Sequence, residues 1–200
     1  SEMRIKGYER VAGAVYQELV RSMRAHHARP GKSRYPVEMK PYAIWQSLAQ
    51  DASIVVVKDI NPIANLKMRE EVTFTGSGGR SKDTMTAATR EYGANDLGII
   101  CEATKDSGEV GINTYLAPNP QLKNTLGMPL LPDEKEMNMS SVFSSSVLAS
   151  PSATYDDMKR MGFISIQHEH GVAVSAQQEN ILRTGYESVI PHRASELFSV

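Results

Sequence analysis

Residues 61–79 read NPIANLKMREEVTFTGSGG, and this stretch sets the expectation for the fold. Asn61-Pro62 is a typical helix start, because proline is tolerated in the first helical turn. The alternation of residue types over 72–75 then predicts a short strand. Three glycines among residues 76–79 permit backbone angles that other residues resist. The stretch therefore predicts a helix, a strand and a flexible glycine-rich loop in succession.

The sequence before this stretch predicts two helices. One apolar residue recurs every four positions between residues 8 and 26, which marks one stripe of a helix: Val11, Val15, Leu19 and Met23. Pro30-Gly31 ends that helix, and a second helical pattern covers residues 41–49. We assign residues 1–52 to a helical segment that leads into a loop-bearing region, residues 53–118.

The remainder divides into a connector and a final segment. Residues 119–150 are rich in Pro, Asn and Ser, which is typical of a connector, and residues 151–200 form the last region. Thr154-x-x-Asp157 resembles a capping box and predicts a helix start at Thr154. Apolar and polar residues alternate over 163–174, which predicts a strand. The expected fold class is mixed α+β, with helices packed around short strands.

Composition limits the functional classes only weakly. The 200 residues are 40% hydrophobic and 22% charged, which is typical of a globular chain that can bury a core. Twenty-two Lys and Arg oppose 23 Asp and Glu, so the chain as a whole has no polybasic signature of a nucleic-acid-binding protein. The segment 67–90 around the glycine-rich loop is locally basic.

The lone cysteine suits a reducing compartment, and no apolar run marks a membrane span or a signal peptide. Cys101 excludes an internal disulfide and a multi-cysteine zinc site. Its apolar neighbours in residues 97–101 should raise the thiol pKa, so we interpret it as a core cysteine rather than a nucleophile. No run of 18 apolar residues and no signal-peptide pattern occurs. A cytoplasmic protein without membrane contact is expected.

Three short patterns could be chemical sites, but each also has a simpler structural explanation. The segment 76–82 could cradle phosphate, but it lacks the Gly-Lys-Ser/Thr ending of such loops, and a flexible hairpin tip is favoured. His168-Glu169-His170 would place two imidazoles on one side of a strand, but no third metal ligand lies nearby in the sequence. Asp156-Asp157 fits the charged first turn of a helix. No metal site is predicted.

Several strings resemble, in order, the β subunit of multisubunit DNA-dependent RNA polymerases. Asn61-Pro62-Ile63 followed by Gly76-x-Gly-Gly is similar to the family pattern Asn-Pro-Leu … Gly-Pro-Gly-Gly, whose loop is named fork loop 2. Residues 98–111, GIICEATKDSGEVG, resemble the family's Gly-Arg-Ile-Cys-Pro-Ile-Glu-Thr-Pro-Glu-Gly-Pro-Asn-Ile-Gly, with one residue fewer near Ala103. These are the first two of four strings that occur in the same order as in the family, and this shared order argues against chance similarity.

The other two strings lie near the end of the chain. Residues 155–160, YDDMKR, resemble the family's His-Asp-Asp-Ala-Asn-Arg, and residues 182–187, LRTGYE, resemble the Gly-Thr-Gly-Met-Glu that follows. The region between the second and third blocks is much reduced relative to the family's external region. Such trimming is similar to the divergent polymerases of large bacteriophages, in which β is often split among several polypeptides.

The resemblance implies a nucleotidyltransferase that transcribes DNA, with this chain active only as part of a complex. It implies partners, namely a β′-like subunit, the remaining β segments, template DNA, nascent RNA and nucleoside triphosphates. The aspartates that bind catalytic Mg²⁺ belong to the β′-like partner in this family, so no catalytic residue is expected here. The location implied is the host cytoplasm or, for a phage protein, the virion.

The resemblance also implies roles for individual residues. Arg160 stands at the family arginine that contacts the triphosphate, where a guanidinium fork suits phosphate oxygens. The residues expected to hold DNA are Gly78, Gly79, Arg80 and Lys82. Those expected near the RNA and hybrid are Asp106, Glu109, Gln167 and His170. Glu109 replaces a neutral family residue, which puts a direct phosphate contact in doubt. The family also implies a helix, not a strand, around Gln167.

Two other functional classes stay open at this stage. The chain could be a stand-alone module that binds nucleic acid or phosphate, or a purely structural subunit. A cleft segment of a polymerase should expose apolar surface and need partners, whereas a stand-alone module should not. We also expect Arg160 and the glycine-rich loop to face one shared cavity.

Overall fold

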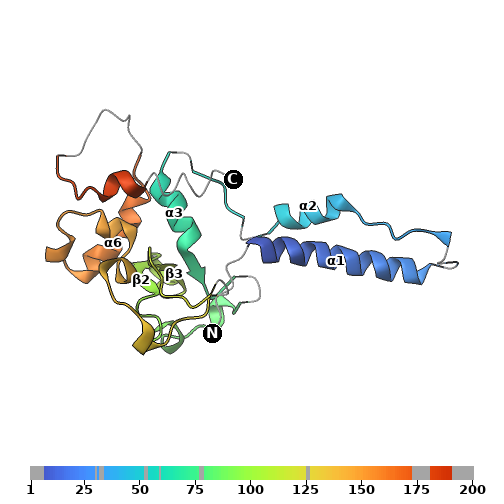
Figure 1. Cartoon of the computed structure of the whole chain (residues 1–200), viewed down its shortest axis with the longest axis horizontal. Coiled ribbons are helices and arrows are strands. Elements are labelled where there is room, and N and C mark those ends of the chain that lie inside the picture. The colour runs from blue at the N-terminus through green and yellow to red at the C-terminus, as the bar shows by residue number, and fades with distance from the viewer. Residues whose placement is uncertain are drawn as a thin grey trace. The chain divides into compact units, whose positions relative to one another are not determined.

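The computed structural model forms two compact units, residues 4–55 and residues 56–200 with the first three residues. The structure describes residues 7–29, 31, 34–51, 54–58, 60–76, 79–124, 127–172 and 181–190. Figure 1 labels the main elements, and each unit is treated by itself below. Among the described residues, no helix combines the length and apolar character needed to cross a bilayer.

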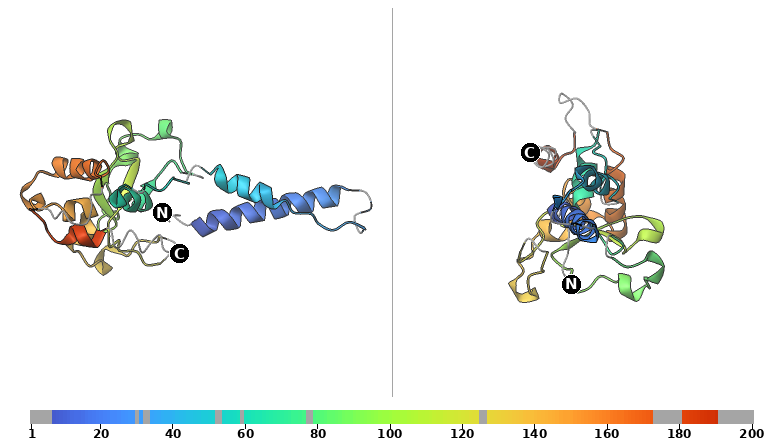
Figure 2. Two further views of the ribbon diagram at one scale, coloured as in Figure 1. Left: turned by 90° about the horizontal axis from the view of Figure 1, so that it is seen from above. Right: turned by 90° about the vertical axis from the view of Figure 1, so that its right-hand side faces the viewer.

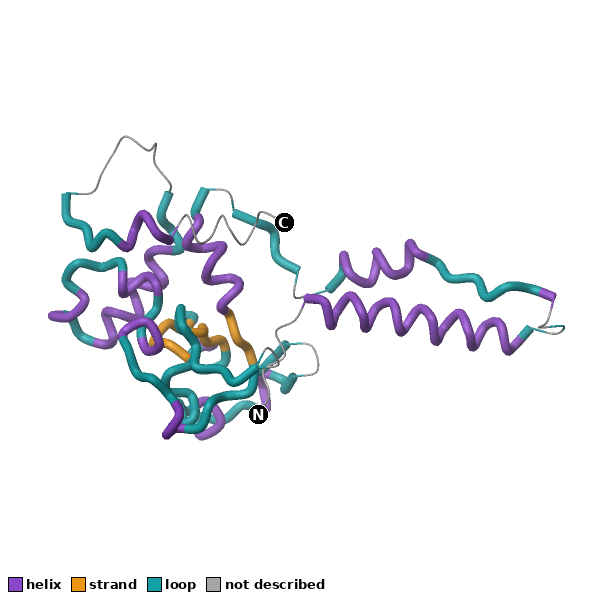
Figure 3. The backbone as a smooth tube through the Cα atoms, viewed as in Figure 1, coloured by secondary structure: helices purple, strands orange, loops and turns teal. Residues whose placement is uncertain are grey.

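The first unit is a helical hairpin. Helix α1 (Gly7–Ala28) and helix α2 (Pro41–Ala49) contact each other and are joined through an extended return segment, residues 36–40 (Figure 3). Both helices were predicted from periodicity, and both are confirmed. The buried side of α1 is narrow and partly polar: Ala14, Glu18 and Ser22. The predicted apolar stripe of α1 is exposed, and α2 buries no residue at all.

Glu18 holds the hairpin together through four hydrogen bonds. Its carboxylate accepts two bonds from the Arg21 guanidinium, both of 2.7 Å, and one from the Ser22 hydroxyl at 3.2 Å. It also accepts the backbone N–H of Lys40 at 2.9 Å, which fixes the return segment against α1. These bonds, with Arg21 the largest cause, lower the pKa of Glu18 to about 2.

The second unit is built on a three-stranded antiparallel sheet. Its strands are β1 (Glu71–Thr73), β2 (Ile100–Thr104) and β3 (Asn113–Leu116), in the spatial order β1-β3-β2. Val72 lies opposite Thr114 on one side of β3, and Ile100 lies opposite Leu116 on the other. The β2–β3 register is irregular between residues 100 and 104. Figure 3 shows the short strands in orange among helices and loops, which confirms the mixed α+β expectation.

Helices pack around this sheet. Helix α3 (Pro62–Glu70) runs directly into β1 and contacts β3, while α4 (Met139–Val142) and α6 (Met158–His168) pack against β2. Helix α5 (Ser145–Leu148) packs against α6. Figure 2 gives two further views of this arrangement. The buried core comprises Cys101, Ala103, Tyr115 and Ala117 around the sheet, and Val147, Ala153 and Met161 between α5 and α6.

Short 3-10 helices connect the larger elements. They are η2 (Lys82–Thr84), η3 (Ala88–Arg90), η4 (Ser107–Glu109), η5 (Pro132–Glu134), η6 (Ala153–Tyr155) and η7 (Tyr186–Ser188). The serine-rich part of residues 119–150 is folded and buried. Ser141, Ser144, Ser145 and Ser146 are each at most 3% exposed, and their small side chains suit the close packing of α4 on β2 and of α5 on α6.

Two local predictions fail in the last segment. The alternation over residues 163–174 predicted a strand, but the described part of it forms the end of α6 and a turn, so the helix implied by the family resemblance is correct. Helix α6 also begins later than Thr154. Its N-cap is Asp157, whose carboxylate accepts the backbone N–H of Lys159 at 3.4 Å. Residues 153–155 instead form η6.

Cys101 lies in the core, as predicted. It is 4% exposed on β2, and burial raises the pKa of its thiol to about 12. A thiol with so high a pKa carries almost no thiolate at neutral pH, so it is a poor nucleophile. The helix start at Asn61 also follows the sequence signal, since the Asn61 side chain accepts the backbone N–H groups of Ile63 and Ala64.

Candidate nucleic-acid and nucleotide interface

The glycine-rich loop after β1 closes on itself. The backbone N–H of Arg80 donates to the Phe74 carbonyl at 2.8 Å, and the N–H of Gly79 donates to the Gly76 carbonyl at 2.7 Å. A Cβ at Gly79 would lie 2.2 Å from the Phe74 oxygen, so a side chain cannot be accommodated there. Gly78 lies outside the described residues. The described part of the loop, residues 74–76 and 79–80, is called the glycine turn below.

The structure brings two groups of predicted site residues together next to this turn. Lys82, expected on the DNA side, has its Nζ 3.9 Å from Oε1 of Glu109, expected near the RNA. Both side chains are about half exposed, 52% and 45%, so the pair is weak and both groups stay available to solvent. Arg80 is exposed, and its side chain has no hydrogen bond or ion pair among the described residues.

Arg90 connects the segment after the glycine turn to the turn at residues 106–111. Its guanidinium donates to the carbonyl of Met85 at 3.2 Å and to that of Gly108 at 3.4 Å. Gly111 has a φ of +73°, and a Cβ there would lie 2.9 Å from the Arg90 carbonyl oxygen, so this close approach needs glycine. Sequence analysis missed this role, because nothing local distinguishes Arg90 from a solvated arginine.

Asp106 opens the second of these turns. Its carboxylate accepts the backbone N–H of Ser107 at 3.0 Å, and its side chain is exposed. We name the set Arg80, Lys82, Arg90, Asp106 and Glu109 the fork cluster. It is a mixed patch of three cationic and two anionic side chains. Such a patch can contact phosphates through its cations, while its acids restrict where a phosphate can lie.

Arg160 lies on a different element, in the first turn of α6. Its side chain is exposed and has no hydrogen bond or ion pair among the described residues. Gln167 follows seven residues later, which is close to two full turns, so it shares a side of the helix with Arg160 about 10 Å further along. Gln167 is also exposed, and His170 is exposed in the turn after the helix. Arg160 and Gln167 therefore lie on α6, and His170 lies in the turn that follows it.

A buried lysine fixes the far end of α6. Lys67, on α3, is 2% exposed, and its Nζ donates to the Ser165 carbonyl at 2.7 Å and the Ser165 hydroxyl at 2.6 Å. It also forms an ion pair of 3.1 Å with Glu169 and lies 4.7 Å from the centre of the Tyr115 ring. Sequence analysis missed Lys67, because its position in a basic segment suggested an exposed side chain.

Titratable groups around Lys67 have shifted pKa values. Burial raises the pKa of Glu70 to about 7, and the nearby Lys67 charge only partly opposes this. Burial also raises the pKa of Glu102, although its carboxylate accepts the backbone N–H and hydroxyl of Ser144 at 2.9 and 2.6 Å. Burial, and then the Lys67 charge, lower the pKa of His168. These groups are packed inside the unit rather than along a cleft, so we assign them a structural role.

The His168 region does not form the predicted kind of strand site. His168 ends α6 and is half-buried, with its carbonyl oxygen accepting the Asn61 side-chain amide at 2.7 Å, whereas His170 is exposed in the following turn. The two imidazoles therefore do not lie on one side of a strand. Within the described ranges, no three His, Cys, Asp or Glu side chains gather closely enough to hold a metal ion.

Arg160 and the glycine turn do not line a common hollow among those found in the described residues. Helix α6 packs against β2, whereas the glycine turn follows β1, and β1 and β2 are the two opposite edges of the sheet. One hollow of the second unit lies between α4, α5 and α6, and it is almost wholly apolar, with Phe143, Val147 and Met161 among its residues. Neither hollow found among the described residues is lined by both Arg160 and the glycine turn, so the shared cavity expected from the sequence stays a prediction.

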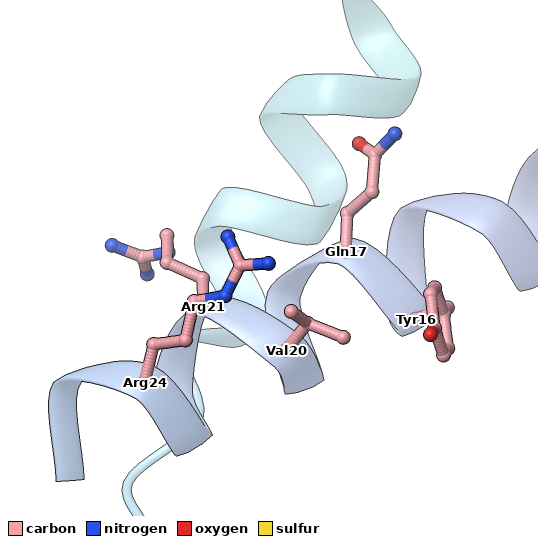
Figure 4. Close-up of a pocket in the computed structure, with 5 residues that line it drawn as sticks. All are labelled: Tyr16, Gln17, Val20, Arg21 and Arg24. Carbon is pink, nitrogen blue, oxygen red and sulfur yellow. The ribbon is translucent and has the colours of Figure 1, made fainter. Parts of the chain in front are cut away.

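A second hollow lies on α1 of the helical hairpin. Figure 4 shows its five residues, Tyr16, Gln17, Val20, Arg21 and Arg24, along the helix, with the side chains of Arg21 and Arg24 next to each other. Arg21 is held by Glu18, whereas the side chain of Arg24 has no hydrogen bond or ion pair among the described residues. Sequence analysis assigned no function to this face.

Comparison with known proteins gives one family. A family model described as bacteriophage RNA polymerase matches residues 1–82. That range contains the whole helical hairpin, α3, β1, the glycine turn, Arg80 and Lys82. The match supports a phage RNA polymerase. It supports a role in transcription as a DNA-directed RNA polymerase, but it does not distinguish a β subunit from other polymerase architectures. No curated protein matches the chain.

Proposed function

We propose that this chain is a segment of a β-like subunit in a multisubunit phage RNA polymerase. In that role it positions template DNA, the RNA 3′ end and the incoming nucleoside triphosphate. The observation that carries the proposal is the match of residues 1–82 to a bacteriophage RNA polymerase family, together with the collinear β-subunit strings that continue beyond it to residue 187. The proximity of Lys82 and Glu109 supports the same assignment.

The roles of the site residues follow from their chemistry. Arg160 contacts the triphosphate, because an exposed guanidinium without an intramolecular partner can bind phosphate oxygens in a bidentate way. Gly78, Gly79, Arg80 and Lys82 contact the DNA backbone. On the RNA and hybrid side are Asp106, Glu109, Gln167 and His170. Aspartates of a β′-like partner would hold the catalytic Mg²⁺, which would supply the charge that orients and neutralises the phosphates.

Arg160 and the glycine turn lie next to different strands of the sheet, and in the proposed role partner subunits complete the cleft around them. The β′-like subunit and the remaining β segments are the proposed partners, with the host cytoplasm or the virion as the location. Exposed apolar side chains support this need for partners over a stand-alone module. In α2, Tyr42 is 73% exposed and Trp45 is 68% exposed. Large aromatic side chains so exposed are typical of protein interfaces.

The test replaces Arg160 in the assembled polymerase. Arg160→Ala should raise the KM for nucleoside triphosphates about tenfold or more and slow elongation, since one charge-assisted phosphate contact contributes about 1.5–3 kcal/mol. Lys159→Ala is the matched control, because it removes a neighbouring exposed cation from the same helical turn. Equal and small effects of both substitutions would favour the purely structural subunit over the proposed role.

A further inference from the structure

The charge of the chain is divided unequally between its two units. Residues 4–55 contain nine Lys or Arg and four Asp or Glu, a net charge of +5. All other residues contain thirteen Lys or Arg and nineteen Asp or Glu, a net charge of −6, and the two values add to the −1 of the whole chain. The near-neutral total therefore conceals a basic helical hairpin. A separation of this size indicates a polyanionic partner for the basic unit.

Most of the positive charge lies in the second half of α1 and in the residues after it. Arg24, Arg29 and Arg34 are exposed, and their side chains have no hydrogen bond or ion pair among the described residues. Two described acids lie in this part of the hairpin: Glu18 is committed to Arg21, Ser22 and the Lys40 amide, and Glu38 is exposed on the return segment. Glu18 is therefore not available to the other three arginines, and none of them forms an ion pair with Glu38 in the described structure.

The local geometry holds these cations in place. His26 bonds through Nε2 to the Tyr35 carbonyl at 2.8 Å, and the N–H of Arg34 donates to the Gly31 carbonyl at 3.1 Å. The first contact holds the end of α1 to the chain just before the return segment, and the second closes the turn between them. Glu18 uses the Nε and one terminal nitrogen of Arg21, which leaves N–H donors of the same guanidinium for a ligand. A preorganised arginine loses less entropy when it binds phosphate.

Two simpler explanations do not account for the whole patch. Cations at the C-terminal end of a helix interact favourably with the helix dipole, which can account for Arg29, the residue directly after α1. Arg34 lies well beyond the end of the helix, where this effect has fallen off. A basic amphipathic helix can also bind an anionic membrane surface. The excess of arginine, whose fork matches phosphate geometry, and the exposed aromatic rings of Tyr16 and Tyr35 favour nucleic acid.

We infer that the helical hairpin is a nucleic-acid-binding surface in which Arg24, Arg29 and Arg34 contact backbone phosphates and Arg21 supports them. The hollow on α1 is lined by Tyr16 at one end and by Arg21 and Arg24 at the other, so a base or ribose can pack on the same helix that holds the phosphates (Figure 4). The residues of this surface belong to the first unit, whereas the fork cluster and Arg160 belong to the second. The choice of nucleic acid over other polyanions rests in part on the proposed function.

The test measures binding of the full 200-residue chain to a fluorescent 20-nucleotide single strand and to the matching duplex over a series of salt concentrations. Arg24→Gln with Arg34→Gln should weaken binding about tenfold or more and reduce the slope of log K against log salt by about two. Lys58→Gln with Lys123→Gln is the matched control. Both of these lysines are exposed cations of the second unit, and their removal should change binding less than twofold.

Three outcomes would overturn the inference. They are equal losses in the two double variants, no binding of either nucleic acid at low salt, or stronger binding to phosphatidylglycerol vesicles that the arginine variant abolishes. Benzoylphenylalanine in place of Arg24 gives a second measurement in the assembled polymerase, where it should crosslink to nucleic acid and the same group in place of Lys123 should not. Neither measurement depends on nucleotide KM, so the Arg160 test can fail while this one succeeds.

Discussion

The Lys67 ammonium group donates two hydrogen bonds to Ser165, one to its carbonyl oxygen at 2.7 Å and one to its hydroxyl at 2.6 Å. These residues are 98 positions apart, and their contact joins α3 to α6 beneath the exposed side that carries Arg160 and Gln167. The ion pair with Glu169 adds a third partner at the end of α6. Lys67 is therefore the side chain that sets where α6 lies relative to the helix preceding the glycine turn.

Lys67→Met should destabilise the second unit by about 3 kcal/mol. The substitution keeps an aliphatic chain of similar length but leaves the Ser165 hydroxyl and Glu169 without their cation. Urea unfolding followed by circular dichroism measures the change. Lys58→Met, at an exposed position, should change stability by less than about 0.5 kcal/mol. A similarly small effect at Lys67 would mean that the buried network does not stabilise the fold.

Stability should fall as the pH rises from about 4.5 to about 7, because of Glu70. Burial raises its folded-state pKa to about 7 from an ordinary value of 4.5, so the folded state binds the proton more tightly than the unfolded state. Glu70→Gln removes this ionisation. At pH 8 the variant should be more stable than the parent by up to about 3 kcal/mol, and near pH 4.5 the two should be nearly equal.

Urea unfolding at both pH values, with each variant compared to its parent, checks the Glu70 prediction. His168 has a lowered pKa and works in the opposite direction, since stability that depends on its neutral form is lost at low pH. That contribution is common to the parent and the variant, so the difference between them isolates Glu70. A difference that stays constant with pH would show that Glu70 titrates at its ordinary pKa.

Local sequence signals were sufficient for the first half of the chain. The four-residue spacing of apolar residues predicted α1. Asn61-Pro62 predicted the start of α3, because capping and proline geometry act over a few residues. Alternation gave β1 next to the glycine turn. At the start of α3 the interactions that set the structure join neighbours in the sequence, so a short pattern is enough to predict it. For β1 the pattern marks the strand but not its pairing with β3.

The later elements depend on distant contacts that the pattern does not show. The alternation over residues 163–174 predicted a strand, but α6 is selected by the Asp157 cap, by packing on β2 and by the contact of Ser165 with Lys67. The Ser144 hydroxyl likewise bonds to Glu102, 42 positions away, inside a segment with the composition of a connector. For the site, the sequence indicated the residues but not that Lys82 and Glu109 would be adjacent.

Gly79→Ala should disrupt the glycine turn, whereas Gly76→Ala should not. A Cβ at Gly79 would lie 2.2 Å from the Phe74 oxygen, a backbone atom that cannot move away without breaking its bond to the Arg80 N–H. A Cβ at Gly76 would lie 3.4 Å from the Thr73 methyl group, an ordinary contact. Amide hydrogen exchange at Arg80 should become much faster in the Gly79 variant. Slow exchange in both variants would contradict the described turn.

Gly162→Ala should stabilise the second unit by about 0.5–1 kcal/mol. Gly162 lies inside α6, and a Cβ there would meet nothing within 4 Å, so alanine gains helix propensity without a clash. Thermal unfolding of the chain measures the gain. Gly171→Ala is a useful contrast, since its Cβ would lie 3.3 Å from the His168 carbonyl oxygen. No gain at Gly162 would indicate that α6 is ordered by packing alone.

Lys82→Ala should weaken DNA binding without a loss of stability. The Lys82–Glu109 pair is 3.9 Å long with both side chains about half exposed, so it should contribute less than about 0.5 kcal/mol to folding. Removal of one phosphate contact should lower DNA affinity similarly for all sequences and reduce the salt slope by about one. Glu109→Gln should act in the opposite direction, because it removes an acid that competes with phosphate for the same lysine. Lys123→Ala is the control. If Lys82→Ala instead lowered stability by more than 1 kcal/mol and left DNA binding unchanged, Lys82 would serve the fold rather than the nucleic acid.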